Sequence, residues 1–283
     1  MNEKTGALFL VGSGRSGTTA LYRHICANFD VGYITAFGAR YPRTLWPAAV
    51  ASRHLSHKGL KPSAESRVLF ERHGLGHDEI QRLGRPIVAS DCAEDMALSF
   101  RRTLSRVARL QAKSVVVVKN TSATTRLNAI SWMAPEAKFL HLVRDGRAVA
   151  ASLSRVEFFP SLRIWWADGR TATELVPKYG SLALVGAEHW SRQVTAALSA
   201  LAELPPERYR TIRYGDFVGE PEKALKSVGE LFPELQRRAS PSRTVLVNSG
   251  SIERWKSDLT PTEISAVSER YGDLLRSIGS EDL

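Results

Sequence analysis

The chain has 283 residues, of which 43% are hydrophobic and 24% charged, and its formal net charge is +10. This composition is ordinary for a soluble globular protein of one large or two small domains. With no apolar run near the ~20 residues needed to span a bilayer, it excludes a transmembrane protein. With only two cysteines it also excludes a disulfide framework. The positive charge favours an anionic ligand, a membrane surface or a nucleic acid without choosing among them.

The first residues lead directly into an apolar run, so we expect no secretory signal and a reduced, cytoplasmic setting. Residues 7–11 predict a buried strand, and a helix is predicted from Thr18 to about Ala27. A glycine-rich turn lies between them. A strand, a glycine loop and a helix N-terminus together form a phosphate cradle, because the backbone N–H groups and the helix dipole favour an anion there. The alternative is a tight turn without a ligand.

This loop differs from the Walker A pattern at one decisive position. Gly12, Gly17 and Thr19 match the two glycines and the hydroxyl residue, but Thr18 stands where the lysine should be. The only cation in the loop is Arg15. The loop can therefore hold phosphate, but the lysine that reaches the outer phosphates of ATP is missing.

The stretch from residue 14 to residue 19 resembles the 5′-phosphosulfate-binding loop of sulfotransferases, which use 3′-phosphoadenosine 5′-phosphosulfate (PAPS). The resemblance implies a P-loop-like fold and the product 3′-phosphoadenosine 5′-phosphate (PAP). It also implies a set of donor-binding residues. These are Gly14, Arg15, Ser16, Gly17, Thr18 and Thr19.

Residues 30–85 lack clean periodicity, and long irregular stretches in compact domains are often binding loops. We expect a partly helical lid or acceptor-site insertion here. Four histidines in this stretch raise the question of a metal site, but their spacing matches no standard pattern and solvated histidines are the favoured reading. They are His54, His57, His73 and His77.

Residues 86–89 form a short candidate strand, and residues 94–110 predict an amphipathic helix rich in arginine. The arginines could mark a nucleic-acid or membrane face, although a solvated helix face is favoured. Residues 114–118 predict a central strand that delivers Lys119. Ligands of open α/β sheets bind at the carboxyl ends of strands, so Lys119 should point toward the phosphate cradle rather than cap a strand at the surface.

Residues 138–143 predict a further strand, which delivers Arg144 to the same edge. A helix should follow from about Gly146 to Arg155, with Asp145 as its N-cap. Ser152 lies eight residues after Arg144. This arginine and serine resemble the sulfotransferase 3′-phosphate-binding motif; the alternative is a helix cap and an unrelated serine.

The last third of the chain predicts further alternation of helices and strands. Residues 156–186 are rich in aromatics and could line an acceptor pocket or simply pack on the body of the protein. A helix at 187–201, a strand at 209–214 and a helix from Pro221 follow. The segments 248–251 and 254–256 only loosely resemble a sulfotransferase 3′-phosphate segment, so Ser249 and Lys256 are left unassigned. A capping box, Thr260 to Glu263, opens the final helix.

Strands that alternate with helices predict a three-layer α/β/α fold with a central, mostly parallel sheet of about five strands. We expect one domain over residues 1–283, with 30–85 and 156–186 as insertions. By resemblance, Lys119 and Arg15 are the catalytic cations, and Arg144 with Ser152 binds the 3′-phosphate. Positioned cations stabilise the charge that develops on the leaving phosphate, so no metal is required.

The sequence identifies neither the acceptor nor the general base. Carbohydrate, lipid, peptide and phenol acceptors all stay open, as does the oligomeric state. Candidate bases are His54, His57, Asp91 and Glu94, none of them favoured. The main alternative is a P-loop kinase acting on a nucleoside or small molecule. A basic nucleic-acid-binding protein is a third reading, but it leaves the phosphate loop unexplained; we therefore expect no nucleic-acid partner.

Overall fold

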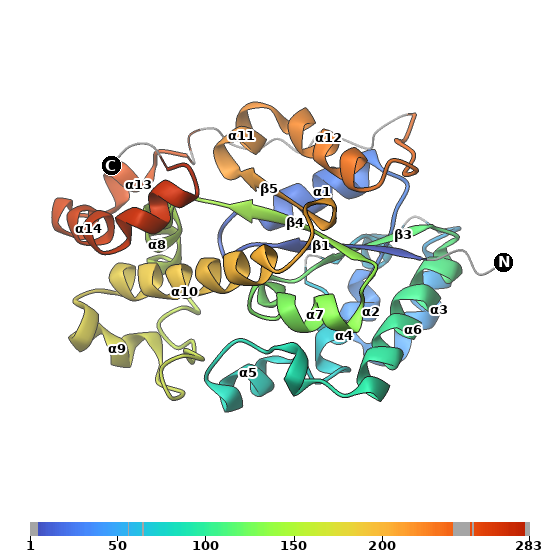
Figure 1. Ribbon diagram of the computed structural model, residues 1–283, viewed down its shortest axis with the longest axis horizontal. Coiled ribbons are helices and arrows are strands. Elements are labelled where there is room, and N and C mark those ends of the chain that lie inside the picture. Colours follow the sequence, from blue (N-terminus) through green and yellow to red (C-terminus); the bar gives the residue numbers. More distant parts are fainter. Residues whose placement is uncertain (1–4, 56, 64, 240–249, 251, 281–283) are drawn as a thin grey trace.

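A five-stranded parallel sheet forms the centre of the molecule, with the strand order β2-β3-β1-β4-β5 (Figure 1). The computed structural model describes residues 5–55, 57–63, 65–239, 250 and 252–280. The strands are β1 (Gly6–Val11), β2 (Gly32–Tyr33), β3 (Val115–Lys119), β4 (Ala137–Val143) and β5 (Tyr209–Arg213).

The position of β1 between β3 and β4 decides where the site lies. Leu10 is in register with Lys119 of β3 on one side and with Leu140 of β4 on the other. All three strands run in the same direction, so their carboxyl ends meet at one edge of the sheet. The loop that follows Val11 therefore emerges between Lys119 and Arg144.

Helices cover both faces of the sheet, because alternate strand residues point to opposite sides (Figure 1). Leu8 and Leu10 pack against one group of helices, and Phe9 and Phe139 pack against another. The first group is α1 (Thr18–Asn28), α11 (Tyr214–Gly219) and α12 (Pro221–Leu231). The second group is α6 (Glu94–Gln111), α7 (Leu127–Met133) and the end of α10 (Leu182–Ala202). The predicted three-layer architecture is confirmed.

The segment 30–85 is helical in part and joins the main core. Its buried Leu45, Val68 and Phe70 pack in the same cluster as Phe9 of β1. The segment contains α2 (Ala36–Arg40), α3 (Leu45–Ala51), α4 (Arg67–Glu71), α5 (His77–Leu83) and the 3₁₀ helices η1 (Pro42–Thr44) and η2 (Lys58–Leu60). His73 is buried rather than solvated, and its Nδ1 lies 2.7 Å from the carbonyl oxygen of Leu69. No three potential metal ligands gather within the described ranges.

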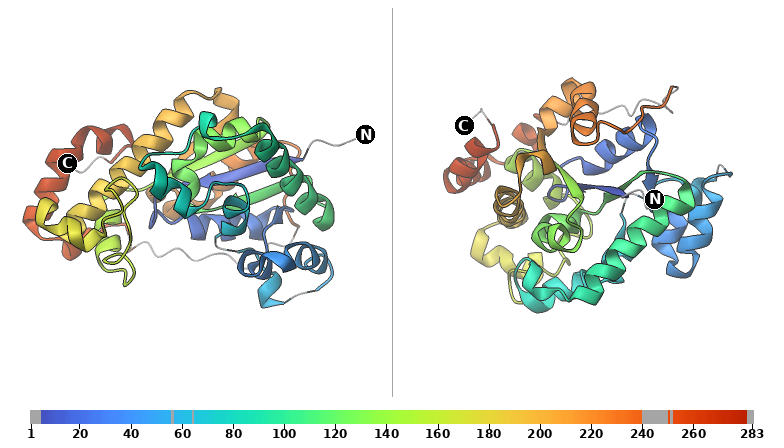
Figure 2. Two further views of the ribbon diagram at one scale, coloured as in Figure 1. Left: turned by 90° about the horizontal axis from the view of Figure 1, so that it is seen from below. Right: turned by 45° about the vertical axis from the view of Figure 1, so that its right-hand side comes forward.

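A further group of helices extends the molecule beyond the sheet, at the end opposite α3 and α6 (Figures 1 and 2). The group comprises α8 (Gly146–Ser154), α9 (Ala172–Tyr179), α13 (Trp255–Asp258) and α14 (Pro261–Ser277). The predicted caps are present: Asp145 accepts a hydrogen bond from the backbone N–H of Arg147, and Thr260 forms a capping box with Glu263. None of the helices described is long and apolar enough to cross a membrane.

One element prediction was wrong, and one predicted helix is present but begins earlier than expected. Residues 86–89 are no strand: the N–H groups of Val88 and Ala89 donate to the side chains of Asp91 and Asn128, and η3 (Ala89–Asp91) follows. The strand that completes the five-stranded sheet is instead the two-residue β2. The helix expected at 187–201 begins five residues earlier, at Leu182, because Ser181 provides the N-cap. The short 3₁₀ helices η4 (Thr121–Thr125) and η5 (Pro206–Arg208) complete the described elements.

Candidate active site

Two glycines are sterically required in the loop between β1 and α1. A Cβ atom on Gly17 would lie 2.4 Å from the ring of Tyr214, and Gly17 has a φ of 91°. A Cβ on Gly12 would lie 2.6 Å from the carbonyl oxygen of Leu142. Gly14, by contrast, has open space around its Cβ position. The loop backbone is therefore packed tightly against β4 and the residue that follows β5.

The helix α1 begins as an anion-binding helix would. Gly17 is the N-cap residue, no described side chain caps this end, and the first turn has no acidic residue. The N–H groups at this end can therefore donate to an anion, and the helix dipole favours negative charge there. Arg15 is exposed and has a left-handed φ of 67°, which is uncommon outside glycine and typical of functional loops.

Side chains from distant elements hold the loop in place. Thr124 Oγ1 accepts from the N–H of Gly12 at 2.9 Å and donates to the Gly12 carbonyl at 2.8 Å. Gln193 Oε1 of α10 accepts from the N–H of Gly14 at 3.2 Å. The hydroxyls of Ser13 and Ser16 are hydrogen-bonded at 2.6 Å. The loop is thus preorganised by η4 and α10, which sequence reasoning did not anticipate.

The two predicted anion-binding motifs meet in space. Arg15 Nε donates to Ser152 Oγ at 3.0 Å, and Arg144 Nη1 donates to the carbonyl oxygen of Arg15 at 2.8 Å. Ser152 was expected to serve the same phosphate as Arg144, and here it accepts a hydrogen bond from Arg15. Arg15 lies in the loop between β1 and α1, Arg144 follows β4, and Ser152 lies in α8. All three nonetheless meet at one edge of the sheet. Burial lowers the pKa of Arg144, and the positive charge of Arg15 lowers it further, against the opposing effect of Tyr214.

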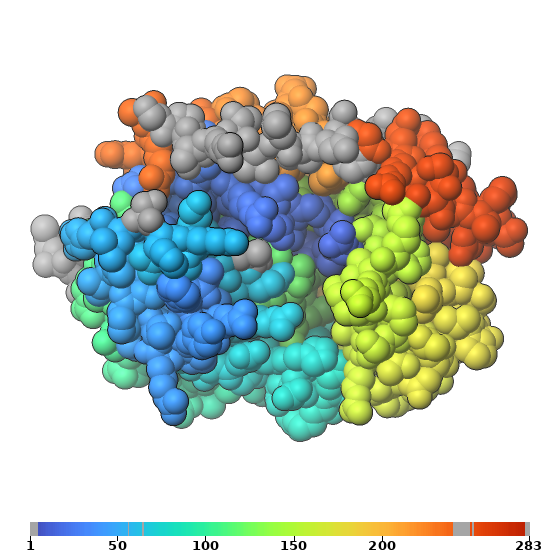
Figure 3. All heavy atoms as spheres, turned by 180° about the vertical axis from the view of Figure 1, so that it is seen from behind, coloured from blue at the N-terminus to red at the C-terminus, as the bar shows by residue number. Residues whose placement is uncertain are grey.

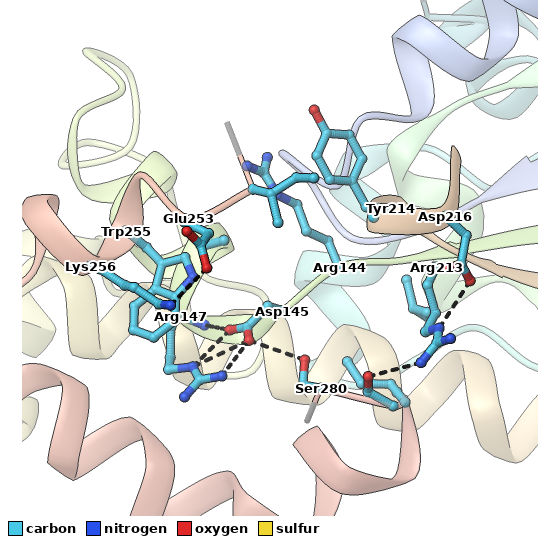
Figure 4. A pocket seen from close by; sticks show the side chains of 16 residues that line it. Arg144, Asp145, Arg147, Arg213, Tyr214, Asp216, Glu253, Trp255, Lys256 and Ser280 are labelled. Atoms are coloured by element: carbon cyan, nitrogen blue, oxygen red, sulfur yellow. Dashed lines mark hydrogen bonds and ion pairs between the residues drawn. The ribbon is translucent and has the colours of Figure 1, made fainter. Parts of the chain in front are cut away.

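A pocket of about 300 Å³ opens beside Arg144 (Figure 4). The guanidinium of Arg144 lies over the ring of Tyr214, 4.4 Å from its centroid. Lys256 and Trp255 also line this pocket, so the loosely matching segment 254–256 does lie near Arg144. Ser249 lies outside the described residues. Three other cations of the wall are ion-paired with acidic neighbours: Arg147 with Asp145 at 2.6 Å, Arg213 with Asp216 at 3.0 Å, and Lys256 with Glu253 at 2.8 Å.

Lys119 is buried at the carboxyl end of β3, with 2% of its side chain exposed. It is not the surface lysine of the alternative reading. Its Nζ forms an ion pair with Glu65 Oε1, and Glu65 belongs to the segment 30–85. Burial lowers the pKa of Lys119 despite the opposing effect of Glu65, and the nearby charges of Arg23 and Arg15 lower it further. Since Leu10 of β1 is in register with Lys119, the lysine lies at the start of the loop that carries Arg15.

The structure does not support the four candidate general bases proposed from the sequence. Arg85 binds Asp91 through two hydrogen bonds of 2.8 and 2.7 Å, which holds the pKa of Asp91 at about 2. His57 Nδ1 accepts from the N–H of Gly59, and its ring stacks on Phe37. His54 is exposed, and Glu94 opens α6. None of these observations links the four residues to the loop.

Sequence reasoning missed Glu65 and Tyr214. Tyr214 is the last residue of the predicted strand at 209–214, so the rule that ligands bind at the carboxyl ends of strands could have identified it. Glu65 lies in the segment without periodicity. Its one signal is that it is the first acidic residue after Asp30.

Figure 3 shows the face where the loop emerges. The dark-blue N-terminal segment is visible between the lighter-blue block around residues 30–60 and the yellow-green block around residues 150–170. The two segments predicted as insertions thus flank this face.

Comparisons with known proteins point in one direction. A family model described as "Sulfotransferase family" matches residues 7–233. The solved sulfotransferase STF1 from Mycobacterium tuberculosis H37Rv is 19% identical with a TM-score of 0.61, and the match covers 95% of this chain and 77% of that one. The solved sulfotransferase STF9 from Mycobacterium avium is 14% identical with a TM-score of 0.60, and the match covers 97% of this chain and 77% of that one.

The sulfotransferase domain from the curacin biosynthetic pathway is 15% identical with a TM-score of 0.53, over 95% of this chain and 98% of that domain. At these identities, the structural matches show a shared fold alone. A search of curated protein sequences gave no match.

Proposed function

This chain belongs to the sulfotransferase family, and from that premise we propose that it transfers a sulfuryl group from PAPS to a hydroxyl or amine of an acceptor. The observation that carries the proposal is the contact between the Arg15 loop and Arg144. A nucleotide with an anionic group at each end suits two adjoining anion sites. ATP has no 3′-phosphate and does not need the second one.

We assign the 5′-phosphosulfate to the loop and the start of α1. Gly12 and Gly17 let the loop backbone pack against Leu142 and Tyr214, and the uncapped helix end supplies N–H donors. Within this assignment the donor contacts come from Gly14, Arg15, Ser16, Gly17, Thr18 and Thr19.

We assign the 3′-phosphate to Arg144 and Ser152. A guanidinium is a strong partner for phosphate because it offers charge and several N–H donors in one plane. In the structure Ser152 is bonded to Arg15, so PAPS binding would exchange this contact for one with phosphate. The ring of Tyr214 orients the guanidinium from one side.

The chemistry follows from the charges at this edge. The acceptor atom forms a bond to sulfur while the bond from sulfur to the bridging oxygen breaks, and negative charge develops on the departing phosphate. Lys119 and Arg15 would stabilise that charge, and removing one such contact typically costs 10²–10³ in rate. A metal ion has no part in this proposal.

The acceptor is proposed only by class. The segments 30–85 and 156–186 flank the loop face, and we propose that they contact the acceptor, a carbohydrate or a lipid among the candidates. The kinase alternative fits less well, because Thr18 replaces the Walker lysine and Lys119 stands where a magnesium ligand would be expected.

The test is transfer of labelled sulfate from PAPS into fractions of cell extract by the purified protein. We expect PAP release together with a labelled product. Magnesium-dependent ATP turnover without PAPS turnover would overturn the proposal in favour of the kinase.

A further inference from the structure

The segment that carries Glu65 is fastened to the carboxyl ends of two strands. Thr35 and Pro62 form an antiparallel bridge just after β2, and the N–H of Ser63 donates to the carbonyl of Ile34 at 2.9 Å. The N–H of Ser66 donates to the carbonyl of Lys119 at 2.9 Å. Glu65 is therefore held at the same sheet edge as the loop by backbone hydrogen bonds.

Both oxygens of the Glu65 carboxylate have partners, and the side chain is partly exposed. Its Oε1 is paired with Lys119 Nζ, and its Oε2 accepts a 3.3 Å hydrogen bond from the N–H of Thr121. The Glu65 side chain is 32% exposed, whereas that of Lys119 is 2% exposed. The carboxylate thus forms the solvent-facing boundary of the Lys119 site.

The ion pair between Glu65 and Lys119 affects an enzyme in which Lys119 contacts the sulfuryl donor. Lys119 is under the influence of two further positive charges, Arg15 and Arg23, which makes this a favourable place for an anion. In the structure the Glu65 carboxylate occupies this place. A phosphosulfate bound at the loop would compete with Glu65 for the same ammonium group.

We propose that Glu65 is the general base of the reaction and that donor binding releases it for this role. This inference rests on the proposed function. When Lys119 turns to the bridging oxygen, the Glu65 carboxylate loses its ion-pair partner and can accept a proton. It then takes the proton of the acceptor hydroxyl as the new oxygen–sulfur bond forms and the bond to the phosphate oxygen breaks. The pair makes deprotonation of the acceptor depend on the presence of the donor.

The variant Glu65→Gln separates this role from a structural one, because it should lower turnover while it raises the affinity for PAP. Release of labelled sulfate from PAPS to water should fall about 100-fold or more, as for loss of a general base. The Kd of PAP, measured by calorimetry, should decrease severalfold, because Lys119 no longer has a competing carboxylate.

Two further variants sharpen the test. Glu65→Asp keeps a carboxylate and should retain part of the PAPS hydrolysis. Glu71→Gln removes an exposed acid from the neighbouring α4 and should leave both measurements unchanged.

Three outcomes would overturn the inference. PAPS hydrolysis by Glu65→Gln within threefold of the wild-type rate would exclude a general base. Weaker PAP binding together with lost turnover would make Glu65 a structural partner of Lys119. If wild-type protein bound no PAP, the donor assignment itself would fail, whatever the result for Glu65.

Discussion

Arg144 is the residue through which the pocket meets the loop between β1 and α1. It stacks on Tyr214, donates to the Arg15 carbonyl and opens on the pocket. We therefore expect Arg144→Ala to weaken PAP binding about 10-fold or more, as for loss of a charged hydrogen bond, and to change AMP binding little. Calorimetry with both nucleotides measures this, and Arg210→Ala near the amino end of β5 is the control. Equal losses for PAP and AMP would contradict the assignment of the 3′-phosphate.

Lys119 is expected to act on the transition state rather than on donor affinity. We predict that Lys119→Ala lowers kcat for PAPS turnover about 10²–10³-fold, with a much smaller change in the Kd of PAP. Steady-state kinetics and calorimetry on one preparation separate the two effects. An unchanged kcat would remove Lys119 from the catalytic residues.

Two glycines of the phosphate loop form a matched pair. Gly17→Ala should lower the Tm and abolish PAP binding, because the new Cβ meets the Tyr214 ring at 2.4 Å and the backbone has a positive φ. Gly14→Ala adds the same atom where nothing lies within 4 Å. Its Tm should stay near that of the wild type in thermal unfolding. A similar loss of Tm in both variants would mean that the loop conformation does not depend on Tyr214.

At the scale of elements, β4 carries an unusual buried group. His141 is completely buried, and neither of its ring nitrogens has a hydrogen-bond partner among the described residues. Burial lowers its pKa from 6.5 to about 4. The unfolded chain therefore binds a proton more readily than the folded one, and stability falls as the pH drops from about 6.5 toward 4.

Replacing His141 should make the protein less sensitive to acid. From these pKa values His141 alone costs about 2 kcal/mol of unfolding free energy between pH 7 and pH 5. In His141→Leu this part of the loss should disappear, while stability at pH 7 stays equal or rises, because two unpaired buried nitrogens are removed. Urea unfolding at the two pH values measures it. The same pH dependence in the variant and the wild type would exclude His141 as a source of acid sensitivity.

An element could be predicted from the sequence where its own residues determine it, and could not be where residues distant in the chain do. β3 could be predicted because four consecutive valines strongly favour a strand, and α8 could be predicted because Asp145 caps it. β2 could not be predicted, since a two-residue strand is defined only by its pairing with β3. The candidate site divides in the same way: the loop, Lys119 and Arg144 follow short patterns, but Glu65 reaches Lys119 across 54 positions of the chain.

At the scale of the whole molecule, the segment 30–85 and the sheet share one core. We expect a single cooperative unfolding transition in which tryptophan fluorescence and far-UV circular dichroism coincide. Trp46 reports on the segment and Trp190 on α10. PAP at 100 times its Kd should shift the whole transition by about 2.7 kcal/mol. An earlier fluorescence change would instead show that the segment unfolds as a separate unit.

The packing of Tyr214 on Gly17 links the donor loop to the order in which the chain is synthesised. The loop glycines leave the ribosome almost first, yet the aromatic ring that fits against them is made about two hundred residues later. A nascent chain that stops before β5 therefore carries the proposed donor-binding loop without the tyrosine ring that packs against it. Competence to bind nucleotide should arise late in translation, and no amino-terminal fragment should possess it.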